Sequence, residues 1–297
     1  MDNEKLAVLH FSNSKKSIPF GKKLFGRKFS DIVLMCLTWT FAAVTLIALL
    51  FIIAHVLIGG IPYLSLSLFE TRFTTQNVSM FPAIISTIYM VGLTLAIAVP
   101  LGIFTSIYLV EYVKSGSRLV RVVRSAAEML AGIPSVVYGL FGMLLFVEFF
   151  GFGWSLIAGA LTLSVMILPV VIRTTEEALI SVSDGYREGG YALGAGKLRV
   201  VFRIVLPSAV PGILSGVILA IGRIIGESAA LIFTAGTVPQ IPETLTHSTR
   251  TLSVHMWALS GEALHTGEAY ATAVVLLIIV LIINTLSALV ARLITAK

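Results

Sequence analysis

The chain has 297 residues, of which 57% are hydrophobic and only 12% are charged, and its mean hydropathy is +0.98. Soluble domains carry about 25% charged residues, so this composition excludes a water-soluble globule and indicates a multi-pass membrane protein. The net charge of +6 does not indicate a nucleic-acid partner, because the cations lie beside apolar runs, where they set membrane topology. The single cysteine, Cys36, excludes an internal disulfide framework.

The N-terminal segment, residues 1–30, is polar and basic, and no small-residue cleavage site follows a short apolar core. We therefore predict a cytoplasmic tail followed by a retained membrane anchor rather than a cleaved signal peptide. The first span is expected at residues 32–58, since about 20 apolar residues cross a membrane. Residues 59–62 end this run, and an external loop is expected to continue to residue 80.

Further apolar runs complete a prediction of six membrane-spanning helices, with spans at 82–110, 129–150, 154–172, 208–234 and 268–290. Pro100 predicts a kink in the second span, where neighbouring helices must cover the freed carbonyl. The intervening segments are expected to be loops: a basic one at 111–127 and a long external one at 235–267. Glu111 and Glu128 are expected to be solvated at the inner membrane edge. Residues 294–297 form a short C-terminal tail.

The distribution of cations predicts the orientation of these spans. All Lys and Arg residues lie in the N-terminal tail, the 111–127 segment, the 173–207 segment or the C-terminus, except Arg72, Arg223 and Arg250. Six spans put both termini on one side, and the positive-inside rule makes that side the cytoplasm. The sequence thus predicts an all-α polytopic membrane protein with cytoplasmic N- and C-termini.

A polar stretch in the second cytoplasmic segment interrupts the apolar chain. It begins at Glu188, continues with small residues, and ends at Ile204-Val-Leu-Pro207. The small residues let another surface approach closely, and Pro207 predicts a helix stop because proline lacks the amide donor. We expect this stretch to dock on an aqueous partner; the alternative is an ordinary amphipathic cytoplasmic loop.

Arg223 and Glu227 lie near the middle of the fifth predicted span, where ionisable residues are costly. Residues four apart share one face of a helix, so Glu227 is expected to pair with Arg223 and orient it. The guanidinium fork suits a phosphate-like oxyanion, which makes both residues candidates for an anion path. The alternative is a structural ion pair that holds helices together.

The run Gly132-Ile-Pro-Ser135 opens the third predicted span. Pro134 breaks the ladder of backbone hydrogen bonds, and Ser135 supplies a hydroxyl. Broken backbone at membrane depth must line a cavity or be covered by protein. We therefore expect Pro134 and Ser135 to line the substrate path, with a simple packing kink as the alternative.

The sequence contains no pattern that indicates catalysis. The run Gly194-Ala-Gly-Lys197 differs from a phosphate-binding loop, because Tyr191 stands where that loop has glycine and Leu198 where it has Ser or Thr. The histidines of the 235–267 segment lack the spacing of metal ligands. The prediction is a non-catalytic chain with no metal site, no cofactor and no nucleic-acid partner.

The polar stretch resembles the EAA signature of ABC-importer permeases, E-A-A-x3-G-x9-I-x-L-P, with Gly189 and Gly190 where that pattern has two alanines. The runs at 131–142 and 222–236 resemble the PstA-type permeases of bacterial phosphate-specific transport systems. Ser253 stands where that family is expected to have proline. The resemblance covers roughly residues 80–295.

The resemblance implies a type I ABC-importer permease domain at 81–293, with its coupling region at 176–207, in a bacterial plasma membrane. It implies that the chain, surrounded by lipid, forms a phosphate path with a homologous PstC-like permease. Two PstB-like ATPases and a PstS-like phosphate-binding protein would complete the importer. The residues expected to couple to the ATPases are Glu188, Gly189, Gly190, Ala192, Gly194, Ile204, Leu206 and Pro207.

The sequence leaves two alternative functions open. The same fold could import another oxyanion, such as sulfate or molybdate, or a small polar organic solute. A secondary transporter or channel is less favoured, because it would need a pseudo-repeat or a complete path within one chain, and a cytoplasmic docking stretch would have no purpose in it.

Overall fold

The computed structural model describes residues 28–114, 116–261 and 265–295. The predicted basic tail therefore lies almost entirely outside the described residues, as do residues 296–297 of the predicted C-terminal tail. The chain divides into two units, the first ending at His55 and the second beginning at Val56. The described part of the first unit is helical and belongs to α1 (Lys28–Gly60).

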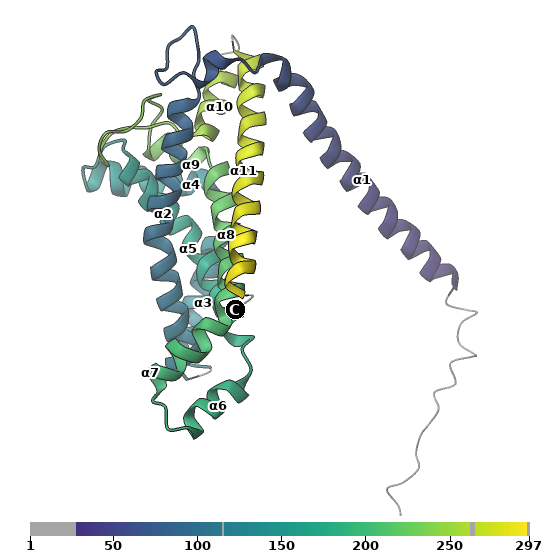
Figure 1. The fold of residues 1–297 in the computed structure, drawn as a ribbon, viewed down its shortest axis with the longest axis vertical. Coiled ribbons are helices and arrows are strands. Elements are labelled where there is room, and N and C mark those ends of the chain that lie inside the picture. The colour runs from purple at the N-terminus through teal and green to yellow at the C-terminus, as the bar shows by residue number, and fades with distance from the viewer. Residues whose placement is uncertain (1–27, 115, 262–264, 296–297) are drawn as a thin grey trace, which may run out of the picture. The chain divides into compact units, whose positions relative to one another are not determined.

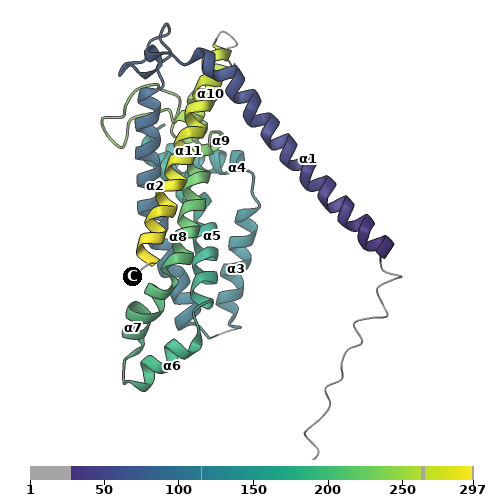
Figure 2. The same cartoon turned by 45° about the vertical axis from the view of Figure 1, so that its right-hand side comes forward.

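The second unit is a bundle of helices (Figures 1 and 2). Its α-helices are α2 (Phe81–Ile107), α3 (Arg118–Ala131), α4 (Ser135–Gly142), α5 (Leu156–Ile180), α6 (Asp184–Ala192), α7 (Lys197–Val200), α8 (Leu206–Gly226), α9 (Ala229–Thr234), α10 (Leu252–Gly261) and α11 (Thr266–Thr295). Short 3-10 helices occur at Ile61–Tyr63 and Leu66–Phe69. Wider π-helical turns occur at Tyr108–Tyr112, Met143–Phe149 and Val201–Val205.

Within the described residues, five helices are long and apolar enough to cross a membrane, and a bent pair formed by α3 and α4 makes a sixth candidate crossing. The straight candidates are Asp31–Tyr63, Phe81–Tyr112, Leu156–Ile180, Lys197–Gly226 and Thr266–Leu289. The prediction of an all-α chain with six spans is confirmed, with one span in two pieces. Helix α2 continues through Pro100.

Two of the predicted spans and two of the predicted loops differ from the structure. The third span does not start at residue 129: α3 already begins at Arg118 and meets α4 at an angle of 104°. The expected 111–127 loop is therefore partly helical. The Ser117 side chain caps the N-terminus of α3 by accepting a hydrogen bond from the amide of Val120 at 3.3 Å. The fifth span ends at Gly226 rather than residue 234, and the expected external loop contains α10.

Helix α5 lies at the centre of the bundle, and small residues let its neighbours approach closely. A β-carbon added at Gly102 of α2 would lie 2.6 Å from the Val171 side chain of α5, and one added at Gly216 of α8 would collide with Thr174. Such close approach favours packing between membrane helices, where lipid leaves no hydrophobic driving force. The central apolar cluster joins α2, α4, α5, α8 and α9.

The two ends of the bundle have separate apolar clusters. At the end that carries α6 and α7, lowest in Figures 1 and 2, Ile107, Leu179 and Val205 belong to one buried cluster. At the opposite end, Met80 and Leu252 belong to another, which joins α2, α10 and α11. These clusters fix both ends of the helices that hold the candidate site.

Candidate functional site

Two broken helices meet inside the bundle. The chain bends between α3 and α4 at Gly132–Pro134, and it breaks again between α8 and α9 at Glu227–Ser228. Helices α4 and α9 lie side by side (Figures 1 and 2), so closely that a β-carbon at Gly139 would be 2.9 Å from the α-carbon of Ala230. The predicted path residues Pro134, Ser135 and Glu227 therefore all lie at the two breaks, and Arg223 lies in the last turn of α8 just before the second one.

The predicted ion pair between Arg223 and Glu227 is not present. Helix α8 ends at Gly226 and Glu227 has an extended backbone (φ −78°, ψ 125°), so the two residues do not share a helical face. The carboxylate of Glu227 instead accepts a hydrogen bond from the amide of Ala230 at 3.1 Å, which caps α9. The expectation failed because it assumed an unbroken helix through the fifth span.

The Arg223 side chain is partly buried, yet no hydrogen bond or ion pair joins it to another residue within the described ranges. Its positive charge acts electrostatically on the phenol of Tyr138 in α4. The hydroxyl of Tyr138 donates a hydrogen bond to the carbonyl of Leu130 in α3 at 2.7 Å. Arg223 thus lies close to the α3–α4 break and keeps its donors available.

Ser253, at the start of α10, contacts the same site. Its side chain is buried, and its hydroxyl donates a hydrogen bond to the backbone carbonyl of Glu227 at 2.5 Å. A proline at this position, as expected from the resemblance, could not make this bond. Ser253, a mismatch with the family pattern in the sequence, therefore makes a contact that fixes the break after α8.

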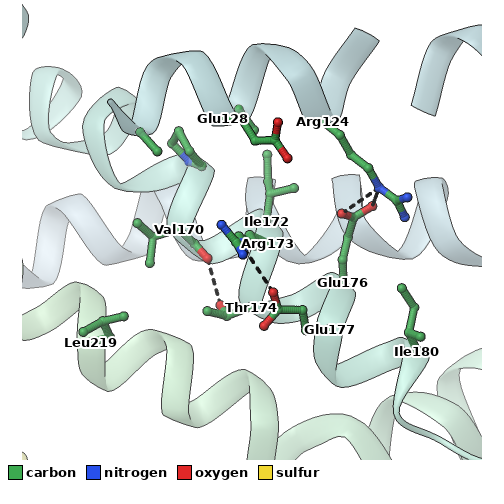
Figure 3. Close-up of a pocket in the computed structure, with 13 residues that line it drawn as sticks. Arg124, Glu128, Val170, Ile172, Arg173, Thr174, Glu176, Glu177, Ile180 and Leu219 are labelled. Atoms are coloured by element: carbon green, nitrogen blue, oxygen red, sulfur yellow. Dashed lines mark hydrogen bonds and ion pairs between the residues drawn. The ribbon is translucent and has the colours of Figure 1, made fainter. Parts of the chain in front are cut away.

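A cavity of about 530 Å³ lies between α3, α5 and α8 (Figure 3). Its wall includes Ala131, next to the α3–α4 break, and Leu219, which is one helical turn before Arg223 and on the same face of α8. The cavity therefore extends from the α3–α4 break along α3, α5 and α8. Arg223 itself is not part of the cavity wall.

Charged side chains line this cavity, as Figure 3 shows. Arg124 contacts Glu176 at 3.2 Å, and Arg173 contacts Glu177 at 3.0 Å. Glu128, predicted to be solvated, also lines the cavity and is exposed. The sequence indicated a role in membrane topology for these cations, but not their contacts in a cavity. Their spacing on α5 was a usable indication, because Arg173 and Glu177 lie on one helical face.

The predicted coupling residues form a compact turn between α6 and α7. Helix α6 ends with Gly194 in the left-handed conformation at φ +79°. The amide of Gly194 donates to the carbonyl of Tyr191 at 2.9 Å, and the amide of Ala195 donates to that of Gly190 at 3.1 Å. This is the Schellman pattern of a helix C-terminus, and it explains the glycine in the motif.

The two glycines that replace alanine in the motif have different environments. A β-carbon at Gly190 would lie 2.8 Å from the Ile204 side chain and 3.0 Å from Val200, whereas one at Gly189 would meet nothing within 4 Å. The first half of the motif therefore packs directly on the second. Glu188, Gly189 and Ala192 are exposed.

Large apolar side chains are also exposed at this tip of the bundle. Leu193 is 90% exposed and Leu198 is 66% exposed, and Tyr186 and Tyr191 are exposed beside them. Exposed apolar residues in a cluster commonly mark a protein interface. The α6–α7 turn thus presents an exposed apolar surface of the kind that protein interfaces use.

The predicted helix stop at Pro207 is wrong. Residues 197–226 form one 30-residue helix in which Pro207 occupies the first turn of α8. The π-helical turn Val201–Val205 precedes it and alters the hydrogen-bonding register where proline has no amide to donate. Leu206 and Pro207 therefore join the coupling turn to the span instead of ending a helix.

Arg250 lies at the end of the bundle opposite the α6–α7 turn. Its Nε donates to the carbonyl of Thr237 at 2.8 Å, its Nη1 is 3.2 Å from Nδ1 of His255, and it stacks over the ring of Phe73. Burial lowers the pKa of His255 to about 4, and the Arg250 charge acts in the same direction, against a smaller opposite effect of the Val78 backbone. His255 is therefore neutral at physiological pH.

Comparison with known proteins identifies the family. A family described as "Binding-protein-dependent transport system inner membrane component" matches residues 98–297, two thirds of the chain. The chain belongs to this family of transporter permeases. It is accordingly a multi-pass protein of the bacterial inner membrane, as its apolar helices require.

Curated relatives agree with the family match. The chain is 33% identical over 276 residues to "Probable ABC transporter permease protein YqgI" of Bacillus subtilis (strain 168), covering 87% of this chain and 94% of that protein. It is 37% identical over 214 residues to "Phosphate transport system permease protein PstA 1" of Mycobacterium tuberculosis (strain CDC 1551 / Oshkosh), covering 71% and 70%. The resemblance to PstA-type permeases is thereby confirmed.

Solved structures support the fold. The permease chain of a bacterial alginate ABC transporter, in complex with a periplasmic protein carrying alginate pentasaccharide, superposes with a TM-score of 0.66 at 17% identity, over 91% of this chain and 98% of that one. A chain of the MetNI methionine ABC transporter gives 0.58 at 18% identity, over 72% and 94%. At these identities the likeness shows the type I importer permease fold and nothing about cargo.

Proposed function

We propose that this chain is a transmembrane permease subunit of an ATP-driven phosphate importer. The assignment of phosphate as the cargo rests on the relatives that are named as phosphate transport permeases. The observation that carries the proposal is Arg223, a partly buried guanidinium beside two helix breaks that has no acceptor among the described residues. A guanidinium fork with free donors binds a tetrahedral oxyanion through two parallel hydrogen bonds.

The proposed path combines Arg223 with the breaks and the cavity. Pro134 and Ser135 lie at the first break and Glu227 lies at the second, and the charged cavity begins at Ala131 beside the first break. Broken backbone inside a membrane is expected where it lines a path or is covered by protein. The Arg–Glu pairs of the cavity wall offer a polar surface without a net excess of free cations, which suits release of an anion rather than its trapping.

The permease works with partners in this proposal. A homologous PstC-like permease completes the path, a PstS-like binding protein delivers inorganic phosphate, and two PstB-like subunits hydrolyse ATP, so this chain has no catalytic role. Glu188 to Pro207 couples it to an ATPase, and the exposed Leu193 and Leu198 supply apolar docking contacts. Closure of the ATPase dimer moves the coupling turns, and rigid-body motion switches access to the path.

Uptake of labelled phosphate tests the proposal. In proteoliposomes that hold the complete importer, Arg223→Gln should reduce uptake about tenfold or more, since it removes a charge-assisted bidentate contact. ATP hydrolysis and assembly should persist. Arg223→Lys keeps the charge without the fork and should retain an intermediate rate, while Arg121→Gln, a control at an exposed site on α3, should transport at the original rate.

Two outcomes would contradict the proposal. Unchanged uptake in Arg223→Gln would remove this residue from the path. Unlabelled sulfate or molybdate is added as a competitor of labelled phosphate. If either anion inhibits uptake at concentrations too low for unlabelled phosphate to inhibit it, the importer carries another oxyanion. That alternative has some support, because the name of the Bacillus subtilis relative, which matches more of the chain, specifies no cargo.

A further inference from the structure

The guanidinium of Arg187 in α6 is enclosed by oxygen acceptors. Its Nε and Nη2 donate to Oε1 of Glu111 at 3.1 and 2.9 Å, and Nη2 also donates to the carbonyl of Leu179 at 2.9 Å. Its Nη1 donates to the carbonyl of Val182 at 2.7 Å and to Oδ1 of Asp184 at 3.1 Å. The Arg187 and Glu111 side chains are only 15% and 6% exposed. The contact is therefore largely shielded from water.

These acceptors belong to different helices. Glu111 lies in the π-helical turn Tyr108–Tyr112 that ends α2, and Leu179 lies in the last turn of α5. The last carbonyls of a helix have no partner within it, and an arginine can satisfy them. Arg187 thus ties α6 to the ends of both α2 and α5. Glu111 was predicted to be solvated, and this was wrong because Arg187, 76 residues away in the chain, compensates its charge.

A second contact joins the same two regions. The ammonium of Lys197, at the start of α7, lies 4.8 Å from the centre of the Tyr112 ring, within the range of a cation–π interaction. Beneath both contacts, Ile107 of α2 packs in one buried cluster with Val200 and Val205. The end of α2 is therefore attached to the α6–α7 turn by charge, by an aromatic face and by apolar packing.

We infer that Glu111 and Arg187 are positioning residues that pass displacement of α6 to α2. The inference rests on the proposed docking of the α6–α7 turn on an ATPase. Helix α8 is continuous with α7 and moves with it directly, but α2 reaches the turn only through side-chain contacts. A buried ion pair with fixed fork geometry resists shear, so α2 follows α6 as a body.

Asp184 provides a matched control for Glu111. Both carboxylates contact Arg187, at 3.1 and 2.9 Å, but Asp184 is on the same helix as Arg187 and is 88% exposed. It cannot carry force between helices. Glu111→Gln and Asp184→Asn each remove one negative charge that contacts Arg187 and keep an amide oxygen as an acceptor. They differ in that Glu111 is buried and bridges α6 to α2, whereas Asp184 is exposed and lies within α6.

The experiment compares these two variants in the complete importer in proteoliposomes. Glu111→Gln should assemble and hydrolyse ATP within about twofold of the original rate, while phosphate uptake per ATP falls about tenfold, equivalent to about 1.4 kcal/mol of lost coupling. Asp184→Asn should retain both rates within about twofold. Equal uptake per ATP in the two variants would overturn the inference. Loss of assembly in Glu111→Gln would also overturn it, since the pair would then act only in folding.

A second readout does not depend on the cargo. Leu219 lines the cavity and is 62% exposed, so Leu219→Cys in a Cys36→Ser background can be labelled with a membrane-impermeant thiol reagent. Addition of ATP and vanadate should change the labelling rate in the parent and in Asp184→Asn, but not in Glu111→Gln. The same change in all three would overturn the inference. Failure of phosphate uptake with a normal labelling change would instead reject only the proposed cargo.

Discussion

Two arginines of this permease lie at opposite extremes of hydrogen-bonding. Arg187, at the coupling end, donates to a buried carboxylate, an exposed carboxylate and two backbone carbonyls. Arg223, beside the helix breaks, donates to no residue in the described part of the chain. Both are partly buried, so burial does not separate their roles. The difference lies in whether the protein itself supplies acceptors for the guanidinium donors. The donors of Arg187 are occupied and hold helices together, whereas those of Arg223 are available to an anion.

The largest expected effect comes from removing the guanidinium of Arg187. Arg187→Gln leaves the Glu111 carboxylate buried without its cation, and breaking a buried pair in this way costs about 3–5 kcal/mol. Arg223→Gln removes no hydrogen bond or ion pair of the described residues and should change the free energy of unfolding by about 0.5 kcal/mol or less. Thermal unfolding of the purified importer in detergent measures both. A similar loss in the two variants would show that the fork of Arg223 is filled within the assembled importer.

Protonation of His255 would place a second positive charge beside Arg250, another arginine whose donors are occupied by the protein. The pKa of His255 is about 4 in the folded chain and about 6.5 when unfolded, so the unfolded state binds a proton first as the pH falls. This contribution to stability is complete above pH 6.5 and is lost progressively between pH 6.5 and 4. At pH 5.5 the loss should be about 1.4 kcal/mol. His255→Gln should lose less stability over the same range, and an identical pH profile would contradict this account.

A smaller effect than those of Arg187→Gln and of His255 protonation is expected at the break after α8. Ser253→Ala removes the hydrogen bond to the Glu227 carbonyl and should cost about 1 kcal/mol of stability. If this bond fixes the break that positions Arg223, the apparent KM for phosphate should rise while the maximal rate changes little. Ser260→Ala serves as a control, because that hydroxyl only bonds back to Met256 within α10. Equal kinetics in the two variants would separate Ser253 from the site.

The sequence predicted the number and approximate positions of the spans because their signal is local. Long apolar runs, the basic segments and the motif spacing could all be read within about 30 residues. It also predicted the break in the backbone at Gly132–Ser135, where α3 and α4 meet, but it did not predict the break after Arg223. These features need no knowledge of which helices are neighbours.

The errors all involve contacts or breaks that local pattern does not determine. The Arg223–Glu227 pair was expected from a helical period of 3.6, but Ser253 and Ala230 hold Glu227 outside the helix. Pro207 was expected to stop a helix, but a preceding π-helical turn accommodates it. Glu111 was expected in water because its partner, Arg187, is distant in sequence. In each case tertiary context outweighed a local rule.

The continuity of residues 197–226 has a mechanical consequence. Because α7, the π-helical turn and α8 form one helix, the α6–α7 turn and Arg223 lie at opposite ends of a single rigid element. The distance from Lys197 to Arg223 is about 39 Å at 1.5 Å of rise per residue. If this helix rotates by about 10° about its Lys197 end, Arg223 is displaced by about 7 Å over that length. In the proposed importer, a small rotation of the coupling end would therefore be amplified into a displacement of several ångströms at the guanidinium that is proposed to bind the anion.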